Sequence, residues 1–137
     1  MKIIELKYMK VVETKPKSPY NFDATVFKPA HYPDPLKIHE TGKYWFAMRL
    51  ENKIYGIKME SLGTTNKPKI KITIFSKPRI TKDESKKVID ELAFRFEFNR
   101  DISEFYKKFK NDRIISPFIK KWYGMHGSCA QNLYGLL

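Results

Sequence analysis

The fold is decided where the sequence passes from Lys67-Pro-Lys-Ile-Lys-Ile-Thr-Ile-Phe75 into Thr81-Lys-Asp-Glu-Ser-Lys-Lys-Val88. In the first stretch isoleucines alternate with polar residues, a period of two that is typical of a strand with one buried face. In the second, Thr81 and Glu84 match a helix capping box. The helical spacing that follows places five apolar residues on one stripe: Val88, Ile89, Leu92, Ala93 and Phe96. The sequence therefore predicts a strand followed by a long amphipathic helix.

Upstream of this point the same period of two predicts further strands. Ile4, Leu6 and Tyr8 indicate a first strand near the N-terminus. The proline-rich residues 14–36 predict a loop with a short helical turn at Phe22–Phe27. Two strands joined by a turn at Glu51-Asn52-Lys53 form a predicted β-hairpin. Its inward residues are Tyr44, Phe46, Met48, Leu50, Tyr55, Ile57 and Met59, which leaves Trp45 on the opposite face.

Downstream of the long helix, capping signals predict shorter helices. Asp101-Ile-Ser-Glu104 matches a second capping box, and Ser116-Pro117 fits a helix start with proline at the first helical position. Gly124 is a natural helix stop, and residues 129–137 resemble the beginning of another helix. Strands followed by helices favour an α+β fold, an antiparallel sheet packed on a long helix. We expect a sheet-plus-helix domain over residues 1–100 and a helical segment over residues 101–137.

Bulk composition limits the classes of protein to which the chain can belong. With 137 residues, 42% of them hydrophobic, it can bury a core without disulfides. No apolar run is long enough to span a membrane, and the N-terminus lacks the features of a signal peptide. A single cysteine, Cys129, favours a reducing, cytoplasmic location. The apolar end Leu133–Leu137 predicts poor solubility or a dimer.

The net charge of +12 favours polyanionic partners, nucleic acid first and an acidic membrane second. Lysine-rich thermophile proteins carry such charge on their surfaces without binding anything. The segment 107–121 has six basic residues (Lys107, Lys108, Lys110, Arg113, Lys120 and Lys121) against one acid, Asp112. This segment is either a basic patch that contacts nucleic acid or a solvated helix face.

Other kinds of site receive weak support from the sequence. His126-Gly-Ser-Cys129 offers two metal-ligand types, but His31 and His39 are distant, and a structural metal site needs about four ligands. Cys129 and Ser128 have a nearby histidine but no orienting acid, so a catalytic triad is not indicated. Gly124-Met-His-Gly127 matches a backbone-clamping loop found in one RNA-binding fold, in the wrong order of elements. A stacking platform on the sheet could combine Tyr44, Trp45, Arg49, Lys53, Tyr55 and Lys58, although the tyrosines fit a core equally well.

The order of these segments resembles the N-terminal part of the 3-methyladenine DNA glycosylase II and 8-oxoguanine DNA glycosylase group. Tyr20-Asn-Phe22-Asp23 is similar to a segment near the start of that domain, and Gly42–Trp45 and Ile54–Ile57 are similar to its central hairpin. Further similar segments are Ile70–Phe75, Lys82–Phe98, Asp101–Phe105, Ile115–Met125 and Asn132–Leu137. The chain departs from the pattern at His126, where the group has arginine, and at Gly135, which stands where the resemblance implies a helix.

The resemblance implies a sheet-and-helix domain like one half of the TATA-binding protein, followed by the start of an all-helical core. The helix-hairpin-helix motif and catalytic aspartate of the group would lie beyond Leu137, so the chain alone is predicted to be inactive, without catalytic residues, metal or cofactor. The implied function is a non-catalytic or shortened form of a base-excision-repair glycosylase for alkylated or oxidised bases. Its partners would be double-stranded DNA and a catalytic helical core in cis or in trans.

The residues best placed for contact with the DNA backbone are the basic ones of the helical segment: Lys107, Lys108, Lys110, Lys120 and Lys121. A second hypothesis is a stand-alone basic nucleic-acid-binding module without enzymatic activity, which would use either its sheet or this lysine patch. A third is a protein-interaction subunit whose core comes from another chain.

Overall fold

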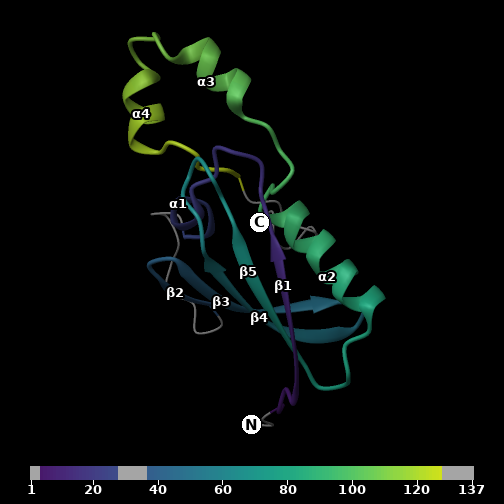
Figure 1. The fold of residues 1–137 in the computed structure, drawn as a ribbon. Helices are drawn as coiled ribbons and strands as arrows, with labels where there is room; N and C mark the ends of the chain where they lie inside the picture. Colours follow the sequence, from purple (N-terminus) through teal and green to yellow (C-terminus); the bar gives the residue numbers. More distant parts are fainter. Residues whose placement is uncertain (1–3, 28–36, 128–137) are drawn as a thin grey trace.

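The computed structural model describes residues 4–27 and 37–127 and forms an α+β fold (Figure 1). Its strands are β1 (Tyr8–Thr14), β2 (Lys37–Glu40), β3 (Lys43–Leu50), β4 (Lys53–Ser61) and β5 (Ile70–Ser76). Its helices are α1 (Phe22–Val26), α2 (Lys82–Arg95), α3 (Ser103–Phe109) and α4 (Ser116–Lys121). The strands form one antiparallel sheet in the order β1-β5-β4-β3-β2. The α+β class and the antiparallel sheet expected from the sequence are confirmed.

The core lies between one face of the sheet and α2. Ile70, Ile72 and Ile74 of β5 are at most 1% exposed, and they belong to the same cluster as Val88 and Leu92 of the helix. Fully burying one side chain of this kind stabilises the fold by about 1.5–3 kcal/mol. The alternating strand and the helical stripe read from the sequence therefore form the two sides of the core.

The predicted β3–β4 hairpin forms, with a turn one residue shorter than expected, because Lys53 pairs with Leu50 as the first residue of β4. Glu51 and Asn52 have φ values of 47° and 62°, the left-handed pair of a two-residue turn that matches strand twist. Pairing Phe46 with Ile57 across the hairpin directs both side chains into the core. Trp45, one residue away from Phe46, falls on the opposite face, as predicted.

The beginning of the first strand differs from the expectation. The alternation of Ile4, Leu6 and Tyr8 predicted a strand there, but β1 starts at Tyr8. Its partner β5 ends at Ser76, which pairs with Tyr8, so earlier residues have no strand to pair with. Leu6 instead packs over the sheet, where a Cβ added at Gly56 would lie 3.0 Å from the Leu6 Cδ1 atom.

The capping box of α2 is confirmed in both directions. The Glu84 amide donates to the Thr81 hydroxyl over 3.1 Å, and the Thr81 amide donates to the Glu84 carboxylate over 3.0 Å. The predicted helical turn at Phe22–Phe27 is α1, whose Asn21 side chain accepts a hydrogen bond from the Ala24 amide. Among the described residues, no helix is long and apolar enough to cross a membrane.

Candidate nucleic-acid interface

A helical hairpin made of α3 and α4 projects from one end of the sheet-and-helix layer (Figure 1). The loop between the two helices is held by Asp112. One oxygen of its carboxylate accepts hydrogen bonds from the amides of Ile114, over 2.8 Å, and Ile115, over 2.7 Å. This arrangement gives the loop a defined conformation and fixes the two short helices relative to each other.

Both helix starts differ from their predicted caps. The proposed capping box at Asp101–Glu104 does not form, because Ile102 holds the N-cap position and Asp101 accepts from the Ser103 amide over 2.8 Å. Glu104 instead pairs with Lys107 at 2.8 Å. Ser116 is the first residue of α4 and not its cap, because Asp112 already satisfies the amides that precede it. Both predicted helices therefore form, as α3 and α4. Their first residues differ from the prediction because the carboxylates of Asp101 and Asp112 accept hydrogen bonds from backbone amides near each helix start.

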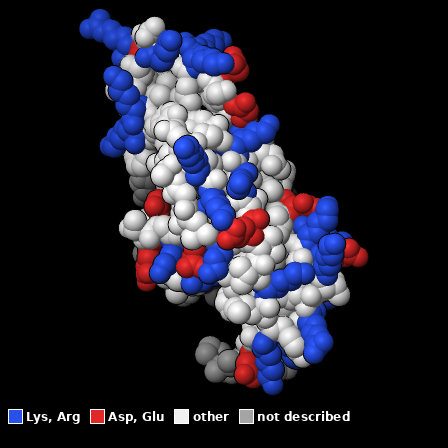
Figure 2. Space-filling view, in the orientation of Figure 1, with Lys and Arg blue, Asp and Glu red and all other residues white. Residues whose placement is uncertain are grey.

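The predicted DNA-contacting residues all lie exposed on this helical hairpin: Lys107, Lys108, Lys110, Lys120 and Lys121. Figure 2 shows Lys and Arg side chains gathered over α3 and α4. Only Lys107 makes a salt bridge within the described residues. The Lys108 ammonium lies 5.5 Å from the centre of the Phe109 ring, and that of Lys121 lies 5.4 Å from the Trp122 ring.

The lysines of the sheet have a different environment. Lys58 and Lys71 approach Glu60 at 3.1 and 3.5 Å, and Lys69 approaches Glu13 at 2.7 Å. These neighbouring carboxylates compensate the charge of three lysines. Other basic residues of the sheet, Lys10, Lys43 and Arg49, make no salt bridge within the described residues, as is the case for four of the five lysines of the helical hairpin.

We call the contact between residues 17–25 and residues 122–127, which fixes the helical hairpin to the sheet, the joint. At its centre, the Gly124 carbonyl accepts from the Asn21 amide over 2.7 Å, and the Gly124 amide donates to the Tyr106 hydroxyl over 2.8 Å. Gly124 has a φ of +79° and is buried. A Cβ added there would lie 2.5 Å from the Thr65 methyl carbon and 2.8 Å from the Asn21 nitrogen. Glycine is thus required by both conformation and space.

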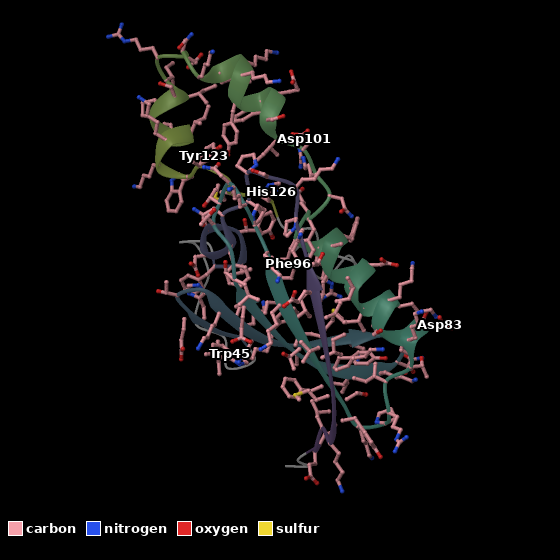
Figure 3. All side chains as sticks on the ribbon, viewed as in Figure 1. Trp45, Asp83, Phe96, Asp101, Tyr123 and His126 are labelled. Atoms are coloured by element: carbon pink, nitrogen blue, oxygen red, sulfur yellow. The ribbon has the colours of Figure 1, made fainter. Side chains whose placement is uncertain are left out.

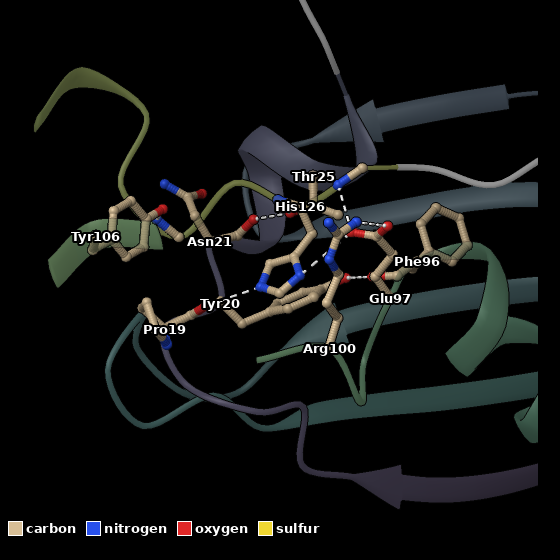
Figure 4. A network of polar contacts seen from close by, with 11 residues as sticks. Pro19, Tyr20, Asn21, Thr25, Phe96, Glu97, Arg100, Tyr106 and His126 are labelled. Atoms are coloured by element: carbon tan, nitrogen blue, oxygen red, sulfur yellow. Dashed lines mark hydrogen bonds and ion pairs between the residues drawn. The ribbon is translucent and has the colours of Figure 1, made fainter. Parts of the chain in front are cut away.

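His126 lies at the foot of the helical hairpin with its side chain fully buried (Figure 3). Its amide donates to the Thr25 hydroxyl over 3.1 Å, and its Nε2 atom lies 3.0 Å from the Pro19 carbonyl oxygen (Figure 4). Because a carbonyl oxygen only accepts, Nε2 carries a hydrogen and donates it. The imidazole also packs against the Tyr20 ring, with 4.8 Å between ring centres.

Glu97 connects the joint to the end of α2. Its carboxylate accepts from the Arg100 guanidinium over 2.7 Å and from the Gly127 amide over 2.9 Å, and lies 3.7 Å from Nδ1 of His126. Partial burial raises the pKa of Glu97, but the hydrogen bonds from Arg100 and Gly127 outweigh it, so the pKa falls below its ordinary value. The carboxylate is therefore charged near neutral pH. Next to it, the buried Tyr20 hydroxyl donates to the Phe96 carbonyl over 2.9 Å.

The joint was missed in the sequence, where Gly124 was read as a helix stop and as part of a Gly-x-x-Gly loop. His126 was read as a weak metal ligand, as a histidine near Ser128 and Cys129, and as a departure from the arginine of the resembled group. The Nε2 atom of His126 is hydrogen-bonded to the Pro19 carbonyl oxygen. His39 lies in β2, where its Nε2 atom is 2.9 Å from the Asp23 carboxylate. No cluster of three or more potential metal ligands occurs among the described residues. Cys129 and Ser128, like His31, lie outside them, as does the apolar end for which a dimer was predicted. The Gly124–Gly127 segment is engaged in the joint, which leaves Gly124 buried.

The stacking platform considered for the sheet is divided between its two faces. Tyr44 and Tyr55 are buried in the core, as their alternation with polar residues suggested. Trp45 lies half-buried on the other face, with the Lys58 ammonium 5.7 Å from the centre of its ring. Of the three aromatic residues considered for the platform, Trp45 is therefore the one that is not buried in the core.

Comparisons with known proteins agree with this fold. No protein-family model matches the chain, and no curated protein matches its sequence. Among solved structures, it is similar to the 3-methyladenine DNA-glycosylase from Archaeoglobus fulgidus, with a TM-score of 0.62 and 16% sequence identity. The match covers 82% of this chain and 36% of that one. The chain thus spans about a third of the length of the glycosylase it matches and shares the fold of part of it, consistent with the N-terminal domain of that enzyme.

Proposed function

We propose that the chain is the N-terminal, non-catalytic domain, or a shortened form, of a base-excision-repair DNA glycosylase that acts on alkylated or oxidised bases. Residues 1–100 form the supporting sheet-and-helix domain, and residues 101–137 begin the helical core. The domain supports that core, supplied in cis or in trans, and its lysines contact the backbone of double-stranded DNA. The likeness in fold to part of a DNA glycosylase supports the proposed enzyme class.

The observation that carries the DNA-binding part of the proposal is the basic helical hairpin. Of its five exposed lysines, four make no salt bridge within the described residues, whereas Lys58 and Lys71 of the sheet, and Lys69 just before β5, are paired with carboxylates. Phosphate contacts from lysines position a protein on a duplex without reading its sequence. A projecting, positively charged element fits that role.

We expect the charge of the helical hairpin to dominate DNA affinity. A variant with glutamine at Lys107, Lys108, Lys110, Lys120 and Lys121 should bind a short DNA duplex about 100-fold more weakly than the unaltered chain. Because each phosphate contact adds about 0.9 to the slope of log affinity against log salt, that slope should fall by about four. Fluorescence anisotropy of a labelled duplex at several salt concentrations measures both quantities.

The matched control carries the same loss of charge on the sheet, with glutamine at Lys43, Lys53, Lys58, Lys69 and Lys71. This control should weaken DNA binding much less, because four of these lysines, Lys53, Lys58, Lys69 and Lys71, already form salt bridges with carboxylates. Equal losses for the two variants would mean that only net charge matters, and the proposed role of the helical hairpin would be wrong.

We also expect the chain alone to release no base from DNA. Chromatography of the free bases after incubation with alkylated or oxidised DNA measures this release. The full-length 3-methyladenine DNA-glycosylase from Archaeoglobus fulgidus is the positive control for alkylated DNA. Base release that scales with the amount of pure protein and survives further purification would contradict the non-catalytic assignment.

One observation favours the second candidate, a stand-alone nucleic-acid-binding module that uses its sheet. Trp45 lies half-buried on the sheet face opposite the core, beside Lys58. Stacking of a base on an aromatic ring contributes about 1–3 kcal/mol. In the same anisotropy assay, Trp45→Ala distinguishes the two functions: weaker binding of single-stranded DNA supports the sheet module, and unchanged binding supports the helical hairpin.

A further inference from the structure

We propose that the sheet face opposite α2, which we call the outer face, binds a small planar aromatic molecule that carries an anionic group. The aromatic ring lies in an apolar hollow of about 300 Å³, and the anionic group meets the Arg49 guanidinium at its rim. The site is separate from the helical hairpin and does not depend on the proposed function.

The outer face is more apolar than a solvated sheet face usually is. An antiparallel sheet with one free face normally directs its polar residues toward water. Here two neighbouring rows across the strands are mainly apolar. One row aligns Met9, Phe75, Gly56 and Ala47, and the next aligns Val11, Thr73, Lys58, Trp45 and Ile38. Met9 is 64% exposed and Ile38 is 57% exposed. Apolar surface of this kind marks an interaction site.

The hollow forms where the middle strand has no side chain. Gly56 of β4 pairs with Ala47 of β3 on one side and with Phe75 of β5 on the other. Trp45 and Phe75 therefore stand on strands about 10 Å apart, with only small groups between them. The residues that line the hollow are Ile38, Trp45, Phe46, Ala47, Gly56, Ile57 and Phe75. Its volume is at the lower end of the range for ligand pockets, about 300–1,000 Å³, so it fits a small molecule.

The lining of the hollow favours an aromatic ring. None of the lining residues is charged, and two of them, Trp45 and Phe75, are aromatic. Both side chains are half-buried, so each still presents part of its ring to a ligand. Aromatic rings attract one another, stacked or edge to face, beyond the contribution of the area that they bury.

A cation at the rim determines the charge of the ligand. Arg49 is exposed, stands two residues after Ala47 on the same face of β3 and makes no salt bridge within the described residues. Two residues of a strand span about 7 Å, a distance that an arginine side chain can cover. A guanidinium with free N–H groups binds an anionic oxygen pair through parallel, charge-assisted hydrogen bonds.

Lys58, the other cation beside the hollow, is less available than Arg49. Its ammonium lies 3.1 Å from the Glu60 carboxylate and 5.7 Å from the centre of the Trp45 ring. The strand register places three acids in the row beyond Trp45, at the end of the hollow away from Arg49: Glu13, Glu60 and Glu40. An anion is therefore expected at the Arg49 end.

Two further carboxylates near this rim have lysine partners. Glu51 stands two residues after Arg49 and accepts a hydrogen bond from Lys87 of α2 over 3.0 Å. Glu5 lies 3.7 Å from Lys7 on the segment that packs over Gly56. Among the described residues, Arg49 thus carries the uncompensated charge at this end of the hollow.

The test uses the full chain, labelled with ¹⁵N and carrying Trp122→Phe, so that the indole N–H resonance of Trp45 reports alone. The probes are 2-naphthoate and 2-naphthylmethylammonium, which share a ring system and carry opposite charges. We expect 2-naphthoate to shift the Trp45 resonance with a Kd on the order of 100 µM. The ammonium probe should bind at least about tenfold more weakly.

One pair of variants tests the charge. Arg49→Gln should weaken 2-naphthoate binding about fivefold or more and remove most of its preference over the ammonium probe. The control Lys43→Gln removes an exposed cation from the same strand, on the other side of Trp45, and should change the affinity less than about twofold.

A second pair tests the shape. Ala47→Leu adds volume to the floor of the hollow and should weaken 2-naphthoate binding about tenfold or more. The control Val11→Leu enlarges a 47% exposed residue of the same face that does not line the hollow, and it should leave binding intact. Circular dichroism checks that each variant folds.

Three results with the probes would overturn the proposal. They are a Trp45 resonance unmoved by 2-naphthoate at about 2 mM, equal binding of the two probes, and binding that Arg49→Gln and Ala47→Leu leave unchanged. Tighter binding of oligothymidylate at the same residues would reassign the face to single-stranded DNA. A dimer that Ile38→Ser disperses would reassign it to a second copy of the chain.

The proposed function is tested separately on the same variants. Ala47→Leu keeps every lysine of the helical hairpin, so its binding of duplex DNA should stay within about twofold of that of the unaltered chain. Binding of 2-naphthoate by a chain that does not bind duplex DNA would reject the proposed function and leave this inference standing.

Discussion

Gly124→Ala is expected to lower the free energy of unfolding by about 3 kcal/mol or more, because it combines a strained backbone with a collision. The φ of +79° disfavours any residue with a Cβ. The new Cβ would also lie 2.8 Å from the Asn21 nitrogen, whose amide bonds to the Gly124 carbonyl. That contact cannot relax without breaking the hydrogen bond that holds the joint together. Chemical denaturation of the purified variant measures the loss.

Gly42→Ala is the matched control for this prediction. Gly42 has a φ of +75°, nearly the same as Gly124, but a Cβ added there would meet nothing within 4 Å. Its substitution should lower the free energy of unfolding by about 1–2 kcal/mol, which is the cost of the strained backbone alone. The difference between the two variants isolates the close packing of the joint. If both lost the same free energy, the joint would contribute nothing beyond backbone strain.

His126→Ala is expected to lower the free energy of unfolding by about 3 kcal/mol, from a cavity and a buried carbonyl left without its donor. The side chain is fully buried, donates to the Pro19 carbonyl and packs on the Tyr20 ring. Trp122 fluorescence in a Trp45→Phe background should show the helical hairpin unfolding at lower denaturant than the sheet. Trp45 fluorescence in a Trp122→Phe background follows the sheet.

Two further variants separate the contributions of His126. His126→Phe keeps a ring against Tyr20 and loses the hydrogen bond, so its effect should fall between those of the unaltered chain and His126→Ala. His39→Ala removes a histidine whose side chain is 19% exposed and bonded to Asp23, and it should cost less than half as much as His126→Ala. Coincident unfolding of Trp45 and Trp122 in the His126→Ala variant would show that the joint does not independently fix the helical hairpin.

Local patterns in the sequence were sufficient to predict most of the fold. The alternation from Ile70 to Ile74 and the stripe from Val88 to Phe96 follow from the geometry of single elements, so neither depends on distant residues. The turn at Glu51–Asn52 is likewise set by its immediate neighbours. The same reasoning failed at residues 4–7, where alternation was present but the partner strand had already ended.

The joint could not be read from the sequence, because its contacts connect segments about a hundred positions apart. His126 bonds to Thr25 and Pro19 across separations of 101 and 107 residues. No periodicity encodes such a pairing, and a single buried histidine has the same sequence signature as an exposed one. The DNA-contacting role of the five lysines stays a prediction, since exposure and charge are necessary for it without being specific to it.

The wide separation of these partners also has a consequence for the order of folding. Chain closure over about a hundred residues is entropically demanding, so such contacts form after local ones. On the ribosome, residues 17–25 are made early and must wait for residues 122–127 before they can make the joint. We therefore expect the sheet and α2 to fold first and the helical hairpin to dock last, leaving Phe105 and Phe118 exposed on the nascent chain throughout.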